Sequence, residues 1–264
     1  MGRDMPRIVV LVKHTPDLTG DRHFLPDGTV DRAAVAGTLS ELDEYAAEQA
    51  LQIKEKHDGW ELTYLTMGPG GAADALRKAL SMGGDAAVHV QDDGLHGSDA
   101  MATSLVLAAA ISRIGFDLVL TGMASTDAGM GVVPALLAER LSVPQITFAG
   151  QLSVSDDTIE IIRDSDFSTE TLVTRMPAVV SVTDRTGEAR YPSFKGIMSA
   201  KKKPVQTWSL ADLGIDPALV GLGAARTAVL SVTARPARTA GQLVKDDGEA
   251  GRALADFLAA QRFI

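Results

Sequence analysis

The stretch Arg7-Ile8-Val9-Val10-Leu11-Val12-Lys13 decides the fold class, because it is a near-continuous apolar run bounded by polar residues. Such a run is typical of a strand that is buried on both faces of a parallel sheet. Similar runs follow at residues 61–66, 86–90 and 116–121. Helical spacing of apolar residues is found in a segment beginning at Ser40 and at residues 72–82, 98–114 and 133–141. Strands that alternate with helices in this way predict an α/β, Rossmann-like fold, with a parallel sheet covered by helices on both faces.

The pattern changes after Pro144. Short runs with the composition of strands lie at residues 152–154, 158–163 and 171–174, close enough in the chain for antiparallel pairing. We expect them to form a small antiparallel hairpin beside the main sheet. Residues 178–182 are apolar again, and we expect this strand to rejoin the parallel sheet.

The chain beyond Lys203 is rich in alanine, glycine and proline and has too few apolar residues for a core of its own. A strand is expected at residues 227–232 and an amphipathic helix at residues 248–263. We therefore expect an α/β domain over residues 1–204. A C-terminal extension over residues 205–264 is expected to pack on this domain or on a partner.

The composition of the 264-residue chain excludes several classes of function. There is no cysteine, which excludes disulfides, thiolate metal sites and cysteine nucleophiles. The five histidines are scattered without the spacing of a ligand pair, so we expect no metal site. A formal net charge of −9 argues against nucleic acid as a partner. With neither a membrane-length apolar run nor a hydrophobic signal core, we expect a cytoplasmic protein without membrane insertion.

In an open parallel sheet, ligands bind beyond the carboxyl ends of the strands. Residues 122–133 are the most suggestive segment there, because their glycines and hydroxyls precede a helix whose free N–H groups favour an anion. A glycine-rich turn without a ligand explains this segment equally well. Ser40 is expected to begin the first helix of the chain, in a capping box with Asp43. The acidic first turn of that helix would repel phosphate, so Asp43 is expected to accept a ribose hydroxyl, unless these acids simply favour the helix dipole.

A second candidate site reads Arg190-Tyr191-Pro192-Ser193-Phe194-Lys195-Gly196-Ile197-Met198-Ser199-Ala200-Lys201-Lys202-Lys203. Its composition predicts a protruding loop that carries one large apolar residue, Phe194. Such a loop is suited to being gripped by another protein. By composition alone, an ordinary surface loop followed by a solvated basic run explains the stretch slightly better.

The order of residues in this stretch resembles the recognition loop of the beta subunit of electron-transfer flavoproteins. Further matching pieces occur in the family's order: residues 7–13, Leu42-Asp43-Glu44-Tyr45, Ala79-Leu80-Ser81-Met82-Gly83, Ile161-Ile162-Arg163-Asp164, Glu170-Thr171-Leu172 and Pro177-Ala178-Val179-Val180. No piece is specific alone, but their shared order over residues 7–204 is hard to obtain by chance.

The resemblance implies an electron carrier subunit without substrate turnover of its own. Such a subunit binds AMP structurally and supports an alpha subunit that carries most of the FAD site, in a heterodimer. It docks acyl-CoA or other flavin dehydrogenases, so that electrons pass through FAD toward a quinone-reducing oxidoreductase and the respiratory chain. FAD and AMP are therefore the implied cofactors.

The resemblance also implies site residues. The positions matching the family's AMP site are Leu11, Ser40, Glu41, Leu42, Asp43, Met67, Ala124, Ser125, Thr126, Asp127, Ala128, Gly129, Met130, Gly131, Val132, Val133 and Pro134. The positions matching its docking residues are Arg190, Tyr191, Phe194, Ile197 and Met198, and those facing the flavin or its mobile domain are Leu18 and Asp164. Residues 40–43 and 125–129 depart from the family's usual patterns, and Val132 replaces a common glutamine. A second FAD, as in electron-bifurcating relatives, therefore stays open, although the loss of polar residues favours AMP.

Two other classes of protein share this type of fold. A homodimeric nucleotide-sensing module would explain the sheet and the glycine-rich loop, but not Phe194 or the long tail. An ATP pyrophosphatase needs a phosphate loop rich in serine and glycine after the first strand, whereas here that strand runs into Lys13-His14-Thr15-Pro16-Asp17.

Overall fold

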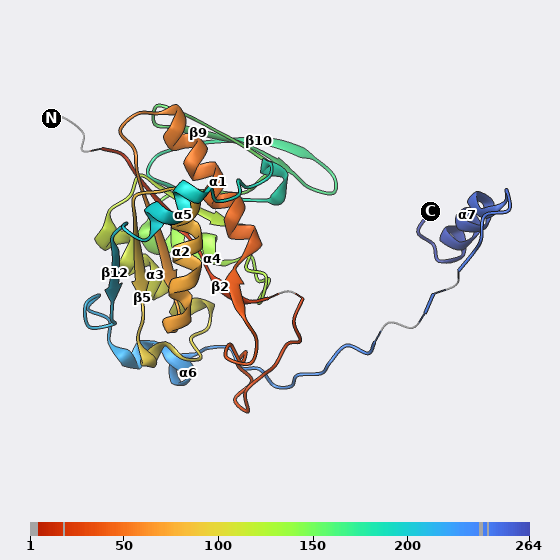
Figure 1. The fold of residues 1–264 in the computed structure, drawn as a ribbon, viewed down its shortest axis with the longest axis horizontal. Coiled ribbons are helices and arrows are strands. Elements are labelled where there is room, and N and C mark those ends of the chain that lie inside the picture. The colour runs from red at the N-terminus through yellow and green to blue at the C-terminus, as the bar shows by residue number, and fades with distance from the viewer. Residues whose placement is uncertain (1–4, 18, 238–239, 242) are drawn as a thin grey trace. The chain divides into compact units, whose positions relative to one another are not determined.

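Seven strands form one parallel sheet in the order β12-β5-β4-β1-β6-β11-β7. They are β1 (Arg7–Leu11), β4 (Glu61–Met67), β5 (Ala86–Val90), β6 (Leu118–Gly122), β7 (Gln145–Ala149), β11 (Ala178–Val182) and β12 (Val205–Trp208). Figure 1 shows β12 beside β5 at one edge of this sheet. The structure is a computed structural model that describes residues 5–17, 19–237, 240–241 and 243–264. In the centre of the sheet, Ile8 of β1 lies beside Leu62 of β4 and Leu118 of β6. The predicted α/β fold is confirmed, and β11 rejoins the sheet as expected.

Helices cover both faces of this sheet. The elements α1 (Glu41–Lys56) and α2 (Ala73–Met82) pack on one face, and α3 (Ala100–Ile114) and α4 (Val133–Leu141) pack on the other. Successive residues of a strand point to opposite faces. Ile8 and Val10 therefore join the core under α1 and α2, whereas Val9 and Leu11 join the core under α3 and α4. Burial on both faces is the reason that β1 reads as a continuous apolar run.

A separate antiparallel sheet has the order β10-β9-β8, which confirms the expected hairpin. Its strands are β8 (Gln151–Ser155), β9 (Thr158–Asp164) and β10 (Thr169–Arg175). Ile159 and Ile161 of β9 are buried in the core that α1 and α2 also share. The long excursion after β1 is closed by a second pairing, between β2 (His14–Pro16) and β3 (Gly37–Leu39).

Two local predictions were wrong. Residues 190–203 contain the short helix α5 (Phe194–Ala200) instead of a continuous loop, because Ser193 Oγ accepts a hydrogen bond from the Gly196 N–H at 3.0 Å and begins the helix. Residues 227–232 are not a strand. The edge of the sheet beside β5 is taken by β12, which comes earlier in the chain.

A compact unit of the chain includes the parallel sheet and extends beyond residue 204. It runs to Leu230 and includes β12, the turn η4 (Pro217–Leu219) and the short helix α6 (Gly221–Ala224). A second unit, Ser231–Ile264, contains α7 (Ala250–Ala260), whose Leu254 and Phe257 are exposed. Packing of the extension on the domain or on a partner stays a prediction. Within the described part of the chain, no helix has the length and apolar character needed to cross a membrane.

Candidate functional site

The loops that follow β1 and β6 meet the start of α1 at the carboxyl edge of the sheet. The Oγ1 atoms of Thr15, after β1, and Thr126, after β6, share a hydrogen bond of 3.0 Å. The N–H of Thr126 in turn donates to Ser40 Oγ over 3.4 Å. Three segments that are far apart in the sequence are therefore joined at one place, where the sequence analysis placed the nucleotide.

Asp43 is buried in the first turn of α1 and ties two strand ends together. Its Oδ2 accepts a hydrogen bond from the backbone N–H of Lys13 at 2.8 Å. A Cβ at Gly122 would lie 2.7 Å from Asp43 Oδ1, so only glycine fits there. Burial raises the pKa of Asp43 to about 7, although the hydrogen bond from Lys13 opposes this shift. The expected capping box is wrong, because Ser40 makes no side-chain cap and Asp43 is bound to Lys13.

Asp127 anchors the glycine-rich loop to the excursion after β1. Its carboxylate accepts from Lys13 Nζ and from Arg32 Nη2, each at 2.8 Å, and only 3% of the side chain is exposed. Burial alone would raise the pKa of Asp127, but the charge and hydrogen bond of Lys13 hold it well below its usual range. Arg32 also donates to the carbonyl of His14. The sequence analysis missed Arg32, because an irregular 20-residue excursion gives no signal of where its side chains point.

The residues at this edge fit a nucleotide. Thr66 Oγ1 is buried at the carboxyl end of β4, beside Met67, and has no hydrogen-bond partner among the described residues. Such an atom can be satisfied by a polar ligand. Gly129 and Gly131 have φ angles of 63° and 67°, which other residues rarely adopt. The other matched positions are buried (Leu11, Ser40, Pro134), half-buried (Leu42, Ala124, Ser125, Val133) or exposed (Glu41, Ala128, Met130, Val132).

The second candidate site, called the docking face below, consists of Tyr191 and of Phe194, Ile197 and Met198 of α5. Tyr191 is 95% exposed and Phe194 is 80% exposed. Ile197 and Met198 are each nearly half exposed. Four large apolar side chains therefore stand in solvent on one short segment, as expected for a protein contact.

Arg190 lies beside this face, but its guanidinium is directed to α1. It donates from Nε to Glu48 Oε2 at 2.7 Å and from Nη2 to Glu48 Oε1 at 3.0 Å, and it also pairs with Glu55. Burial would raise the pKa of Glu48, but hydrogen bonds from Arg190 and Gln52 outweigh it and lower the pKa. This set of contacts, the Arg190 clamp, holds the start of the docking segment on α1.

Close packing on α2 fixes the rest of the docking segment, residues 190–203. A Cβ at Gly196 would lie 2.3 Å from the carbonyl oxygen of Ser81, so α5 approaches α2 more closely than any larger residue allows. Lys203 Nζ donates to the carbonyls of Leu80 and Gly83 at 2.9 and 3.1 Å, which satisfies the C-terminal end of α2. Burial lowers the pKa of Lys203.

Asp164 lies at the end of β9, on the rim of a cavity of about 670 Å³. It accepts from Thr169 Oγ1 and from Arg185 Nη1, each at 2.6 Å, and these contacts lower its pKa. Phe148 lines the same cavity with a φ of 61°, a strained conformation for an aromatic residue and one often found at functional sites. Leu18, the other position matched to the flavin region, lies outside the described residues.

Comparison with known proteins assigns the chain to a family. The family model described as an electron transfer flavoprotein domain matches residues 27–213. Subunits named electron transfer flavoprotein subunit beta, from Mycobacterium tuberculosis and Mycobacterium leprae, are each 47% identical over 98% of this chain and 100% of their own length. A subunit of the caffeyl-CoA reductase-Etf complex of Acetobacterium woodii is 33% identical over 90% of this chain and 91% of its own.

Proposed function

The chain belongs to the electron transfer flavoprotein family, as a beta subunit, and from this premise we propose that it acts as an electron carrier subunit in a heterodimer. In this proposal it holds AMP at the carboxyl edge of the sheet and supports an alpha subunit that carries FAD. It presents its docking face to acyl-CoA or other flavin dehydrogenases. Bound FAD supplies the redox chemistry, and electrons leave toward a quinone-reducing oxidoreductase.

The docking face is the observation that carries this proposal. Phe194 is 80% exposed, yet the Arg190 clamp and the close contact at Gly196 hold its helix in one position. A rigid segment loses little conformational entropy when a partner binds, so exposed apolar side chains on it yield more affinity. An ordinary surface loop has no need of such anchoring.

At the strand edge, the chain's own residues would hold the nucleotide by position and charge. The phosphate would lie at the start of α4, where the first N–H groups of a helix have no partner within it, and away from Glu41 in the first turn of α1. Asp43 would accept a ribose hydroxyl, in addition to its hydrogen bond from Lys13. The nucleotide would therefore stabilise the joined loops and take no part in electron transfer.

Counting nucleotides tests the cofactor assignment. The complex of this chain with its co-expressed alpha subunit is denatured, and the released nucleotides are identified by mass spectrometry with flavin absorbance as a check. We expect one FAD and one AMP per heterodimer. Two FAD and no AMP would replace the simple carrier with a bifurcating type. A complex without flavin would contradict the proposed function.

Phe194→Ala tests the docking assignment. Loss of a central apolar anchor is expected to lower kcat/KM for electron transfer from the dehydrogenase by about 10-fold or more. Flavin content and melting temperature should not change, because the side chain is exposed. Phe167→Ala, on the turn between β9 and β10 and 98% exposed, is the matched control. Unchanged electron transfer from every partner dehydrogenase would remove Phe194 from the contact.

A further inference from the structure

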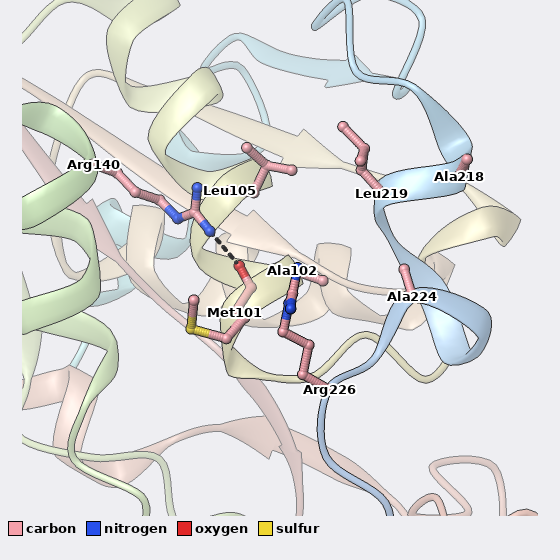
Figure 2. A pocket seen from close by; sticks show the side chains of 8 residues that line it. All are labelled: Met101, Ala102, Leu105, Arg140, Ala218, Leu219, Ala224 and Arg226. Atoms are coloured by element: carbon pink, nitrogen blue, oxygen red, sulfur yellow. Dashed lines mark hydrogen bonds between the residues drawn. The ribbon is translucent and has the colours of Figure 1, made fainter.

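A cavity of about 520 Å³ lies between α3, α4 and the segment of residues 218–226, on the α3 and α4 face of the sheet (Figure 2). Met101, Leu105 and Leu219 form apolar walls, and Arg140 and Arg226 bring two positive charges. None of these residues belongs to the docking face or to the nucleotide site proposed at the carboxyl edge of the sheet. The volume is within the range of cavities that bind ligands or partner side chains.

The outer wall of this cavity is held in place by its own backbone contacts. The N–H of Gly221 donates to Ser98 Oγ at 2.8 Å, and the N–H of Leu222 donates to the carbonyl of His96 at 2.9 Å. Asp99 caps α3 through Ala102 N–H and also accepts from Arg226 N–H at 2.8 Å. The cavity is therefore preformed, and a partner would not have to order this wall on binding.

The charge in the cavity opposes the charge of the chain, which has a formal net charge of −9. Arg140 donates from Nε to Ser104 Oγ at 2.8 Å and from Nη2 to the carbonyl of Met101 at 3.0 Å, as the dashed line in Figure 2 marks for the second contact. These partners fix the guanidinium but leave its charge uncompensated. In the part of the chain that the structure describes, neither Arg140 nor Arg226 forms an ion pair. An acidic group beside apolar side chains is the complement of such a surface.

The rim of the cavity exposes apolar surface that a permanent partner would cover. Met101 and Leu219 are 41% and 56% exposed, and Leu222, outside the lining but on the same segment as Leu219, is 50% exposed. The docking face is carried by α5, which packs on α2 and therefore on the other side of the sheet. A protein bound at the cavity would leave the docking face free, which suits a subunit that stays in place while dehydrogenases bind and leave.

We propose that this cavity is a heterodimer contact, in which a segment of the alpha subunit inserts apolar side chains and places a carboxylate between Arg140 and Arg226. The proposal rests on the proposed function, because that function supplies the permanent partner. A second copy of this chain fits less well, since a two-fold contact through this surface would bring four arginines together.

The test uses the double variant Leu219→Glu/Arg226→Glu, which removes an apolar wall and reverses one charge. We expect the dissociation constant for the alpha subunit, measured by analytical ultracentrifugation, to rise by about 10-fold or more. Arg226→Ala should give a smaller rise, since no repulsion is added. Arg175→Glu on β10, whose side chain is 79% exposed, is the matched control and should leave binding unchanged.

A photoreactive residue at position 219 keeps the proposal testable if the double variant fails to fold. We expect a crosslink to the alpha subunit next to an Asp or Glu. A crosslink to a second copy or to a dehydrogenase would overturn the proposal, as would a small organic acid found in the cavity by native mass spectrometry. If the wild-type chain forms a flavin-loaded heterodimer and the variants bind equally well, only this inference fails. If no heterodimer forms, the proposed function fails with it.

Discussion

Substitutions that break the Arg190 clamp distinguish between two roles that Arg190 could have in docking. If Arg190 contacts the dehydrogenase, Arg190→Met weakens docking and Glu48→Gln does not. If Arg190 instead positions the docking face through α1, both variants weaken docking by similar factors. The geometry favours the second explanation, because Arg190 donates from its backbone N–H, Nε and Nη2 to the carboxylate of Glu48.

The magnitude follows from the burial of Glu48. Its side chain is 7% exposed, so Arg190→Met leaves a buried carboxylate whose remaining hydrogen-bond donors are Gln52 and the backbone N–H of residue 190. Removing one partner of a fully buried ion pair costs about 3–5 kcal/mol. The Arg190 side chain is 32% exposed, and solvent screening reduces the expected loss to about 2 kcal/mol. For a unit of this size, that loss lowers the melting temperature by about 4–8 °C.

Calorimetry of the flavin-loaded heterodimer measures the stability, and steady-state electron transfer from the dehydrogenase measures docking. We expect Arg190→Met and Glu48→Gln to raise KM with little change in kcat, and the double variant to be no worse than Arg190→Met alone. The Arg190 clamp lowers the pKa of Glu48, so its contribution is complete above the ordinary pKa of about 4.5 and is lost in more acidic solution. A wild-type melting temperature for Arg190→Met, or an unchanged KM for Glu48→Gln, would refute this reasoning.

Three further substitutions test the strand edge and α5. Because burial raises the pKa of Asp43 to about 7, its carboxyl group binds a proton more tightly in the folded chain than in the unfolded chain. Wild-type stability should therefore fall by up to about 4 kcal/mol as the pH rises from about 4 to about 7, and Asp43→Asn should lack this fall. The same pH dependence of urea unfolding in both proteins would contradict the assignment. Asp127→Asn removes the ionic partner of Lys13 and Arg32, so AMP content and melting temperature should both drop, more so at low salt; unaltered values in a salt titration would count against the loop anchor. Gly196→Ala should displace α5 from Ser81 and raise KM for the dehydrogenase at normal flavin content, and a wild-type KM would show that the contact is not needed.

The fold could be predicted where a strand is covered by helices on both faces, or where local residues mark the ends of a helix. β1 and β11 are buried on both sides, and their continuous apolar runs are visible in the sequence. α4 begins and ends at the predicted residues, since Pro134 and the polar residues around Leu141 limit it locally. β7 was not predicted, because this edge strand carries polar and apolar residues without a clear period.

The sites could be predicted only in part, because their final geometry depends on contacts between distant segments. Pro192 and Gly196 are typical of a loop, but packing on α2 and the cap from Ser193 stabilise a seven-residue helix there. Asp43 matches a capping box, yet its carboxylate accepts from the N–H of Lys13 in the folded chain. Arg32 gives no local signal at all, although it is one of two cations that hold Asp127.

Helix α1 connects the two proposed sites. Its first turn carries Asp43, which holds the ends of β1 and β6, and its middle and last turns carry Glu48 and Glu55, which hold Arg190. At about 1.5 Å per residue, these carboxylates span about 18 Å of one helix, and Ala46 and Ala50 bury its inner face against the sheet. A helix packed in this way moves as a rigid element, so a ligand that orders its N-terminus also limits where the docking face can lie. This is how a nucleotide that takes no part in electron transfer would still contribute to dehydrogenase docking.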